Sequence, residues 1–121
     1  ELTINRCKET ELISCLCASN AEETESIAKK HPDMMIVEIP ELIGTGKAIS
    51  TVNPEVVINA INVIRKIDEK IFVISGSGIS TKDDVTKAVE LGMQGVGASR
   101  AFVTADNPKE VLTEMALALI K

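Results

Sequence analysis

The sequence predicts an α/β fold in which four parallel strands alternate with helices. Two observations lead to this prediction: short apolar runs of strand length recur along the chain, and a helical pattern follows each of them. The runs are apolar throughout, which is typical of strands in a parallel sheet covered by helices. The units are unevenly spaced, so a solenoid is not expected. With 121 residues, the chain has the length of one compact unit.

Each expected element has a local signal. Residues 1–10 look helical, although no capping residue precedes them. Asn20 and Glu23 form a capping pattern for a helix that runs to Lys30. Pro54 suits the first turn of a long helix, whose apolar residues recur at helical spacing as far as Ile67. Two further helices are expected over residues 81–91, before Gly92, and after Asn107-Pro108. The expected strands are residues 13–18, 34–38, 71–75 and 94–97.

Composition and charge exclude several classes of function. The net charge is −5 and no basic run occurs, which argues against nucleic-acid binding. No apolar stretch reaches membrane-spanning length and no signal-peptide pattern opens the chain, so we expect a cytoplasmic protein without a membrane partner. Two Phe, no Tyr and no Trp predict an aliphatic core. Cys7, Cys15 and Cys17 lack metal-ligand spacing, and we expect buried, reduced thiols and no metal or organic cofactor.

Two consecutive strand ends carry glycine-containing loops. The stretch "SGSGISTKDDV" places Gly76 and Gly78 between a strand and a helix, and "VGASRAF" places Gly97, Ala98 and Ser99 after the next strand. Small residues let an anion approach the backbone, and N–H groups at helix starts can bind it. The loops after strands seven and eight of (β/α)8 barrels bind phosphate in this way. We therefore expect a phosphate site between the two loops.

The stretches "VEIPELIGTGKAIS", "NPEVV", "SGSGIS" and "LGMQGVGAS" resemble the triosephosphate isomerase family in its shorter archaeal form. Their order is similar to strands six, seven and eight and the loops behind them. The resemblance implies that residues 1–121 form a single unit, the second half of a (β/α)8 TIM barrel, covering strands five to eight. It also implies an oligomeric enzyme of glycolysis and gluconeogenesis, which interconverts dihydroxyacetone phosphate and glyceraldehyde 3-phosphate through an enediolate.

Glu38 is the candidate catalytic base. By the period of two along a strand, it shares a face with Met34 and Ile36 and would project into the mouth of a barrel. A carboxylate there can remove a proton from a carbon beside a carbonyl, although a solvated Glu at a strand end is the alternative. The loop that follows would close over the substrate; base and closing loop are established features of this enzyme. The expected phosphate-binding backbone is that of Ile43, Gly44, Gly78, Gly97, Ala98 and Ser99, and the remaining residues of the lid loop, residues 39–46, are Ile39, Pro40, Glu41, Leu42, Thr45 and Gly46.

Several features depart from the family pattern. Ile39 stands where many relatives have Pro, and Arg100 stands where a small residue is expected. We expect Arg100 to point outward, with a phosphate contact as the alternative, and Glu41 to face solvent or latch the lid. The family takes an electrophilic histidine and a substrate-binding lysine from the first half of the barrel, and His31 lies at a helix end instead.

Three interpretations follow. The chain with its missing amino-terminal half, or with a second copy of itself, would act on a phosphorylated triose, and the chain alone would be inactive. Alternatively, it is a half-barrel that serves as a folding or assembly module without catalysis. A third alternative is another phosphate-handling barrel enzyme, such as a synthase, which would have no reason to keep "ELIGTG".

Overall fold

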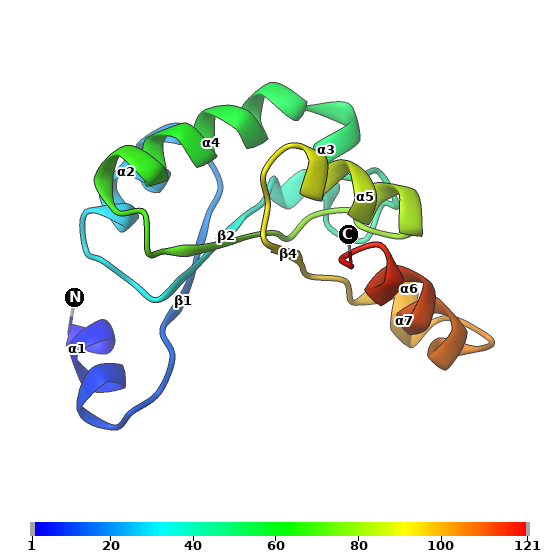
Figure 1. Ribbon diagram of the computed structural model, residues 1–121, viewed down its shortest axis with the longest axis horizontal. Coiled ribbons are helices and arrows are strands. Elements are labelled where there is room, and N and C mark those ends of the chain that lie inside the picture. Colours follow the sequence, from blue (N-terminus) through cyan, green and yellow to red (C-terminus); the bar gives the residue numbers. More distant parts are fainter. Residues whose placement is uncertain (1, 121) are drawn as a thin grey trace.

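The computed structural model describes residues 2–120, which form one sheet with helices. All strand pairs are parallel and the sheet order is β1-β2-β3-β4, so each strand pairs with its neighbour in sequence (Figure 1). The strands are β1 (Cys15–Ala18), β2 (Met34–Val37), β3 (Phe72–Ser75) and β4 (Gly95–Val96). The α/β fold of four parallel strands alternating with helices is therefore confirmed. Compared with the predicted ranges, β1 begins two residues later, β2 ends one residue earlier, β3 begins one residue later, and β4 is one residue shorter at each end.

Helices follow every strand, as expected. They are α1 (Leu2–Glu9), α2 (Ala21–Ala28), η1 (Pro40–Leu42, a 3-10 turn), α3 (Ile49–Val52), α4 (Pro54–Ile67), α5 (Lys82–Glu90), α6 (Arg100–Val103) and α7 (Pro108–Leu117). Figure 1 shows α2, α3, α4 and α5 together along one side of the strands, and α6 and α7 beyond β4. Along this side of the sheet, α2 contacts α4, α4 contacts α3, and α3 contacts α5. The short η1 and α3 were not predicted.

Helix starts follow the capping signals in the sequence. Asn20 Oδ1 accepts a hydrogen bond from Glu23 N at 2.9 Å, and Glu23 Oε2 accepts one from Ser19 N at 2.9 Å. The first of these bonds satisfies a backbone donor in the first turn of α2, and the second joins the Glu23 side chain to the residue before the cap. Thr81 and Asp84 form a complete capping box at the start of α5.

The core lies between the sheet and the helices and is aliphatic, as predicted. Alternate residues of the strands, such as Met35, Val37 and Val73, are fully or almost fully buried there. Val57 and Ile64 of α4 pack into the same cluster and are fully buried as well. A smaller cluster joins α5 and α7 through Ala48, Ile79, Val85 and Met115.

The opposite side of the sheet, which we call the uncovered face, contains no buried side chain from β1, β2 or β3. It consists of Cys15, Cys17, Met34, Ile36, Phe72 and Ile74, all of which are exposed or half-buried. The predicted burial of the thiols is therefore wrong: Cys15 and Cys17 are exposed and Cys7 is half-buried. The two strand cysteines do share one face, but the helices cover the other one, where Ala18 is fully buried.

No helix within residues 2–120 combines the length and the apolarity that crossing a bilayer requires. The same range holds no group of three or more His, Cys, Asp or Glu side chains placed to share a metal ion.

Candidate functional site

Three strand ends meet at one edge of the sheet, the carboxyl rim. The backbone ladder continues one residue past each strand: Glu38 N donates to Ala18 O at 3.1 Å, and Gly76 N donates to Val37 O at 3.0 Å. Gly97 N donates to Ser75 O at 2.7 Å. Glu38, Gly76 and Gly97 therefore lie on three neighbouring strands at the same rim, as a parallel sheet requires.

The Glu38 carboxylate is half-buried and lies beside Gly76. A Cβ atom added at Gly76 would lie 2.9 Å from Glu38 Oε2 and 2.3 Å from Ile36 Cγ2, so any other residue would displace these side chains. Cys17 is the other neighbour: partial burial raises the pKa of its thiol, and the charge of Glu38 and a hydrogen bond to it raise that pKa further. The Glu38 side chain thus lies on the uncovered face, between the Cys17 thiol and the backbone of Gly76.

The lid loop, residues 39–46, is held at both ends by Ser77. Ile39 N donates to Ser77 Oγ at 3.0 Å, and Ile49 N donates to Ser77 O at 3.2 Å just beyond the loop. Ser77 is fully buried. Gly78 adopts a φ of +75°, and a Cβ added there would lie 1.9 Å from Lys47 O, so only glycine allows this approach. The loop that follows β3 therefore fixes where the lid loop leaves β2 and where it returns.

Within the lid loop, backbone and side-chain hydrogen bonds maintain a compact turn. Leu42 N donates to Ile39 O at 2.9 Å, and Leu42 O accepts the Thr45 hydroxyl at 2.8 Å. Ile39 and Leu42 also pack against the main core. Glu41 is exposed to solvent, one of the two positions expected for it.

An open pocket of about 670 Å³ lies at the carboxyl rim beside the lid loop. All six residues expected to bind phosphate line it, together with Thr45 and Gly46 of the lid loop. The remaining lining residues are Gly76, Ile79, Ser80, Arg100, Ala101 and Thr104. Glu38 itself is not a lining residue, but it lies against Gly76, which is. The structure brings these residues together, and their roles remain predictions.

The pocket offers backbone donors without partners. Within residues 2–120, the N–H groups of Gly44, Gly78, Ala98 and Ser99 have no hydrogen-bond acceptor. Two of the six expected donors are already bonded within the chain, because Ile43 N donates to Pro40 O at 3.1 Å and Gly97 N donates to Ser75 O at 2.7 Å. Unpaired N–H donors on residues that line one cavity are suited to binding an anion.

The expectation that helix starts supply the donors is wrong for α5. Asp84 Oδ2 accepts hydrogen bonds from Ser80 N at 3.0 Å and Thr81 N at 2.9 Å, so the cap uses these groups itself. It also places a carboxylate there, which repels anions. The following helix, α6, has only four residues. The free donors therefore belong to loop residues.

Arg100 is exposed, as expected, but its side chain also contacts the lid loop, which was not predicted. Its Nη1 donates to Gly44 O at 3.1 Å, so the side chain reaches the lid loop from the start of α6. The sequence contains no signal for this contact, because the two residues are 56 positions apart. The anchoring role of Ser77 was also not predicted, because the prediction for this loop depended on Gly76 and Gly78.

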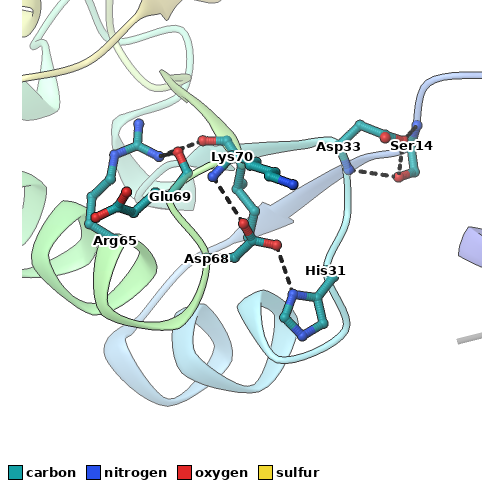
Figure 2. A network of polar contacts seen from close by, with 8 residues as sticks. Ser14, His31, Asp33, Arg65, Asp68, Glu69 and Lys70 are labelled. Atoms are coloured by element: carbon teal, nitrogen blue, oxygen red, sulfur yellow. Dashed lines mark hydrogen bonds and ion pairs between the residues drawn. The ribbon is translucent and has the colours of Figure 1, made fainter.

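His31 lies away from this site, as expected. Its Nδ1 pairs with Asp68 Oδ2 at 2.7 Å, near the amino ends of β2 and β3 (Figure 2). In the same region, Asp33 Oδ2 accepts both the backbone N–H and the hydroxyl of Ser14. These hydrogen bonds lower the pKa values of Asp68 and Asp33 and tie the starts of the strands together.

The fold resembles parts of larger solved structures. The chain superimposes with a TM-score of 0.72 and 19 % identity on a chain of the Amycolatopsis orientalis BexX/CysO complex, covering 96 % of this chain and 44 % of that one. Thiamine phosphate pyrophosphorylase from Pyrococcus furiosus gives a TM-score of 0.71 at 20 % identity, covering 96 % and 54 %. At these identities the likeness shows the fold alone, that of barrel enzymes of the TIM type.

Sequence comparison is more specific. Proteins named triosephosphate isomerase are 43 % identical in Methanobrevibacter smithii, 38 % in Methanothermobacter thermautotrophicus and 36 % in Sulfurisphaera tokodaii. The alignments cover 93 %, 95 % and 98 % of this chain but 50 %, 50 % and 51 % of those proteins. The chain thus spans about half the length of the curated relatives it matches. Since the profile of the triosephosphate isomerase family also matches residues 2–116, the chain belongs to that family.

Proposed function

We propose that the chain forms the second half, strands five to eight, of a triosephosphate isomerase barrel. In that barrel it would interconvert dihydroxyacetone phosphate and glyceraldehyde 3-phosphate. One observation carries the proposal: the Glu38 carboxylate and a pocket with unpaired N–H donors lie side by side at the carboxyl rim. Barrel enzymes keep their chemistry at this rim.

Glu38 is the proposed base. Its carboxylate takes a proton from the carbon beside the substrate carbonyl, which leaves an enediolate, and returns the proton to the adjacent carbon. The phosphate group would bind the free backbone donors of Gly44, Gly78, Ala98 and Ser99 and hold the reacting carbons next to the carboxylate. The lid loop would exclude water during this transfer. The reaction needs neither a metal nor an organic cofactor.

The remaining catalytic groups would come from a partner. The family resemblance implies a histidine and a lysine from the first half of the barrel. The uncovered face supports this proposal, because it exposes Phe72, Cys15 and Cys17 on the side where the first half would close the barrel. A second copy of the chain is the alternative cover for this face. We propose a cytoplasmic location, which suits three free thiols.

A chimera tests the function. This chain would replace the 112-residue matching region of the Methanobrevibacter smithii relative, which supplies the other half of that protein. We expect isomerase activity in a coupled assay, and a loss of about 10²–10⁴-fold in kcat for Glu38→Gln. Glu55→Gln is the matched control, since Glu55 is exposed in α4 and does not line the pocket. An inactive but folded chimera, or equal activity of Glu38→Gln, contradicts the proposal.

A second candidate is a non-catalytic assembly module. The uncovered face favours this candidate, because an exposed apolar sheet face is typical of an interaction surface in enzymes and non-enzymes alike. The same chimera separates the two candidates: a module would restore a folded barrel but show no dependence on Glu38.

A further inference from the structure

Arg100 contacts the lid loop from the far side of the pocket. Its Nη1 donates to the Gly44 carbonyl at 3.1 Å, and its Cδ lies 3.8 Å from the position a Cβ would take at Gly44. The side chain therefore lies along the backbone of the lid loop at Gly44, where the loop has a φ of +73°.

The guanidinium retains unused hydrogen-bonding capacity. It carries five N–H donors, and within residues 2–120 the bond to Gly44 is the one that it makes. Arg100 also takes no part in the ion pairs formed by these residues. It is the one charged residue among those that line the pocket. An unpaired cation thus faces the same cavity as four unpaired N–H groups, in a chain whose net charge is −5.

We propose that Arg100 binds the phosphate group of the ligand through its free N–H donors while Nη1 holds the Gly44 carbonyl. The ligand class is a phosphate monoester dianion or inorganic phosphate. Arg100 thereby couples occupancy of the pocket to the position of the lid loop. The inference rests on the proposed function only in assigning the phosphate to a triose.

The chemistry of the guanidinium supports both contacts at once. Its planar fork can donate to a phosphate oxygen and to a carbonyl in different directions, which a lysine ammonium does with less geometric control. Once the phosphate fixes the guanidinium, the Gly44 carbonyl gains a fixed donor, so the ligand favours the arrangement in which the lid loop is held. Neutral ligands lack this effect, and Arg100 therefore selects for the dianion.

Titration with inorganic phosphate, followed by NMR on the chimera that contains this chain, tests the contact. We expect Arg100→Gln to weaken phosphate binding about tenfold, the effect of losing one charge-assisted hydrogen bond at an exposed site, and Arg100→Lys to fall between it and the unsubstituted chain. Arg6→Gln is the control, because it removes an equally exposed arginine that pairs with Glu9 in α1. Far-UV circular dichroism checks that each variant is folded. Equal affinity of Arg100→Gln and the unsubstituted chain overturns the inference, as does an equal loss in Arg6→Gln.

Amide exchange tests the coupling. Phosphate should slow exchange at Leu42 and Thr45, whose N–H groups bond within the lid loop, in the unsubstituted protein and leave it unchanged in Arg100→Gln at matched occupancy. Equal slowing in both proteins overturns the coupling. These outcomes are independent of isomerase activity: an inactive chimera with Arg100-dependent phosphate binding refutes the proposed function and leaves this inference standing.

Discussion

Replacing Gly76 by alanine should damage the site through a single added methyl group. The new Cβ would lie 2.3 Å from Ile36 Cγ2 and 2.9 Å from Glu38 Oε2. Since carbon–carbon contacts are optimal at about 3.5–4.0 Å, Ile36 or the strand must move by about 1 Å. Gly76 does not have a positive φ, so the effect is steric and not a matter of backbone strain.

The cost can be worked out from these contacts. Overpacking of this kind costs about 1–3 kcal/mol, and the lower chain entropy of unfolded alanine offsets about 0.4–1 kcal/mol of it. We expect a net loss of about 1–2 kcal/mol in the free energy of unfolding. Because Glu38 must shift as well, kcat in the chimera should fall about 100-fold, the penalty for a misplacement of about 1 Å.

Gly97→Ala is the matched control for stability. Gly97 ends the neighbouring strand, and its added Cβ would meet nothing closer than Ser75 O at 3.8 Å. Urea unfolding of the two variant chimeras, followed by far-UV circular dichroism because the chain lacks tryptophan, measures the difference. If Gly76→Ala is as stable as Gly97→Ala, the close packing of Glu38 against Gly76 is refuted.

Three further predictions concern the lid anchor, pH and the isolated chain. Ser77→Ala leaves Ile39 N–H without its acceptor and should cost about 1–3 kcal/mol of stability in urea unfolding of the chimera; an unchanged midpoint contradicts the anchor. The hydrogen bond from His31 lowers the pKa of Asp68 in the folded protein. Ionised Asp68 therefore stabilises the folded protein at pH values above its pKa in the unfolded chain, about 4, and this stabilisation is lost as the pH falls through its pKa in the folded protein. The stability difference between the unsubstituted protein and Asp68→Asn should therefore shrink below about pH 4, and a difference independent of pH refutes this. The 121-residue chain alone should be a dimer or larger oligomer, and a folded monomer in sedimentation equilibrium contradicts this. Its isomerase activity should be at background, and turnover that Glu38→Gln abolishes contradicts that expectation.

Local signals predicted the order of strands and helices, because apolar runs, caps and glycines act within a few residues. The four-residue α3 escaped prediction since its formation depends on tertiary contacts: Ile49 is fully buried and the Ser50 hydroxyl donates to Asp84 O at 3.3 Å. Alternation placed Cys15 and Cys17 on one face, but it carries no information about which face the helices cover.

The candidate site was predicted where it depends on strand ends and glycines, and missed where it depends on distant contacts. The pairing of Arg100 with Gly44 and the anchoring of Ile39 by Ser77 join segments 56 and 38 residues apart. The stretch "TKDD" carries the capping-box pattern of α5. This pattern predicts that the Asp84 carboxylate accepts hydrogen bonds from the backbone at the start of that helix.

The arrangement of the rim gives a physical reason for dividing the proposed reaction among three strands. Glu38 directly follows β2 and Gly97 directly follows β4, so two strand spacings, about 10 Å, separate the base from the far side of the pocket. A three-carbon chain that ends in a phosphate spans about 7 Å, and a hydrogen bond of about 3 Å from the backbone to the phosphate brings the total to about 10 Å. A shorter separation would bring the carboxylate against the phosphate dianion, and the two negative charges would repel each other. Gly76 directly follows β3, between the positions of Glu38 and Gly97, and its lack of a side chain leaves room for the substrate carbons between the phosphate and the base. Arg100 adds a positive charge on the phosphate side of the pocket. The spacing of a parallel sheet thus separates the two anions that the reaction must hold at once.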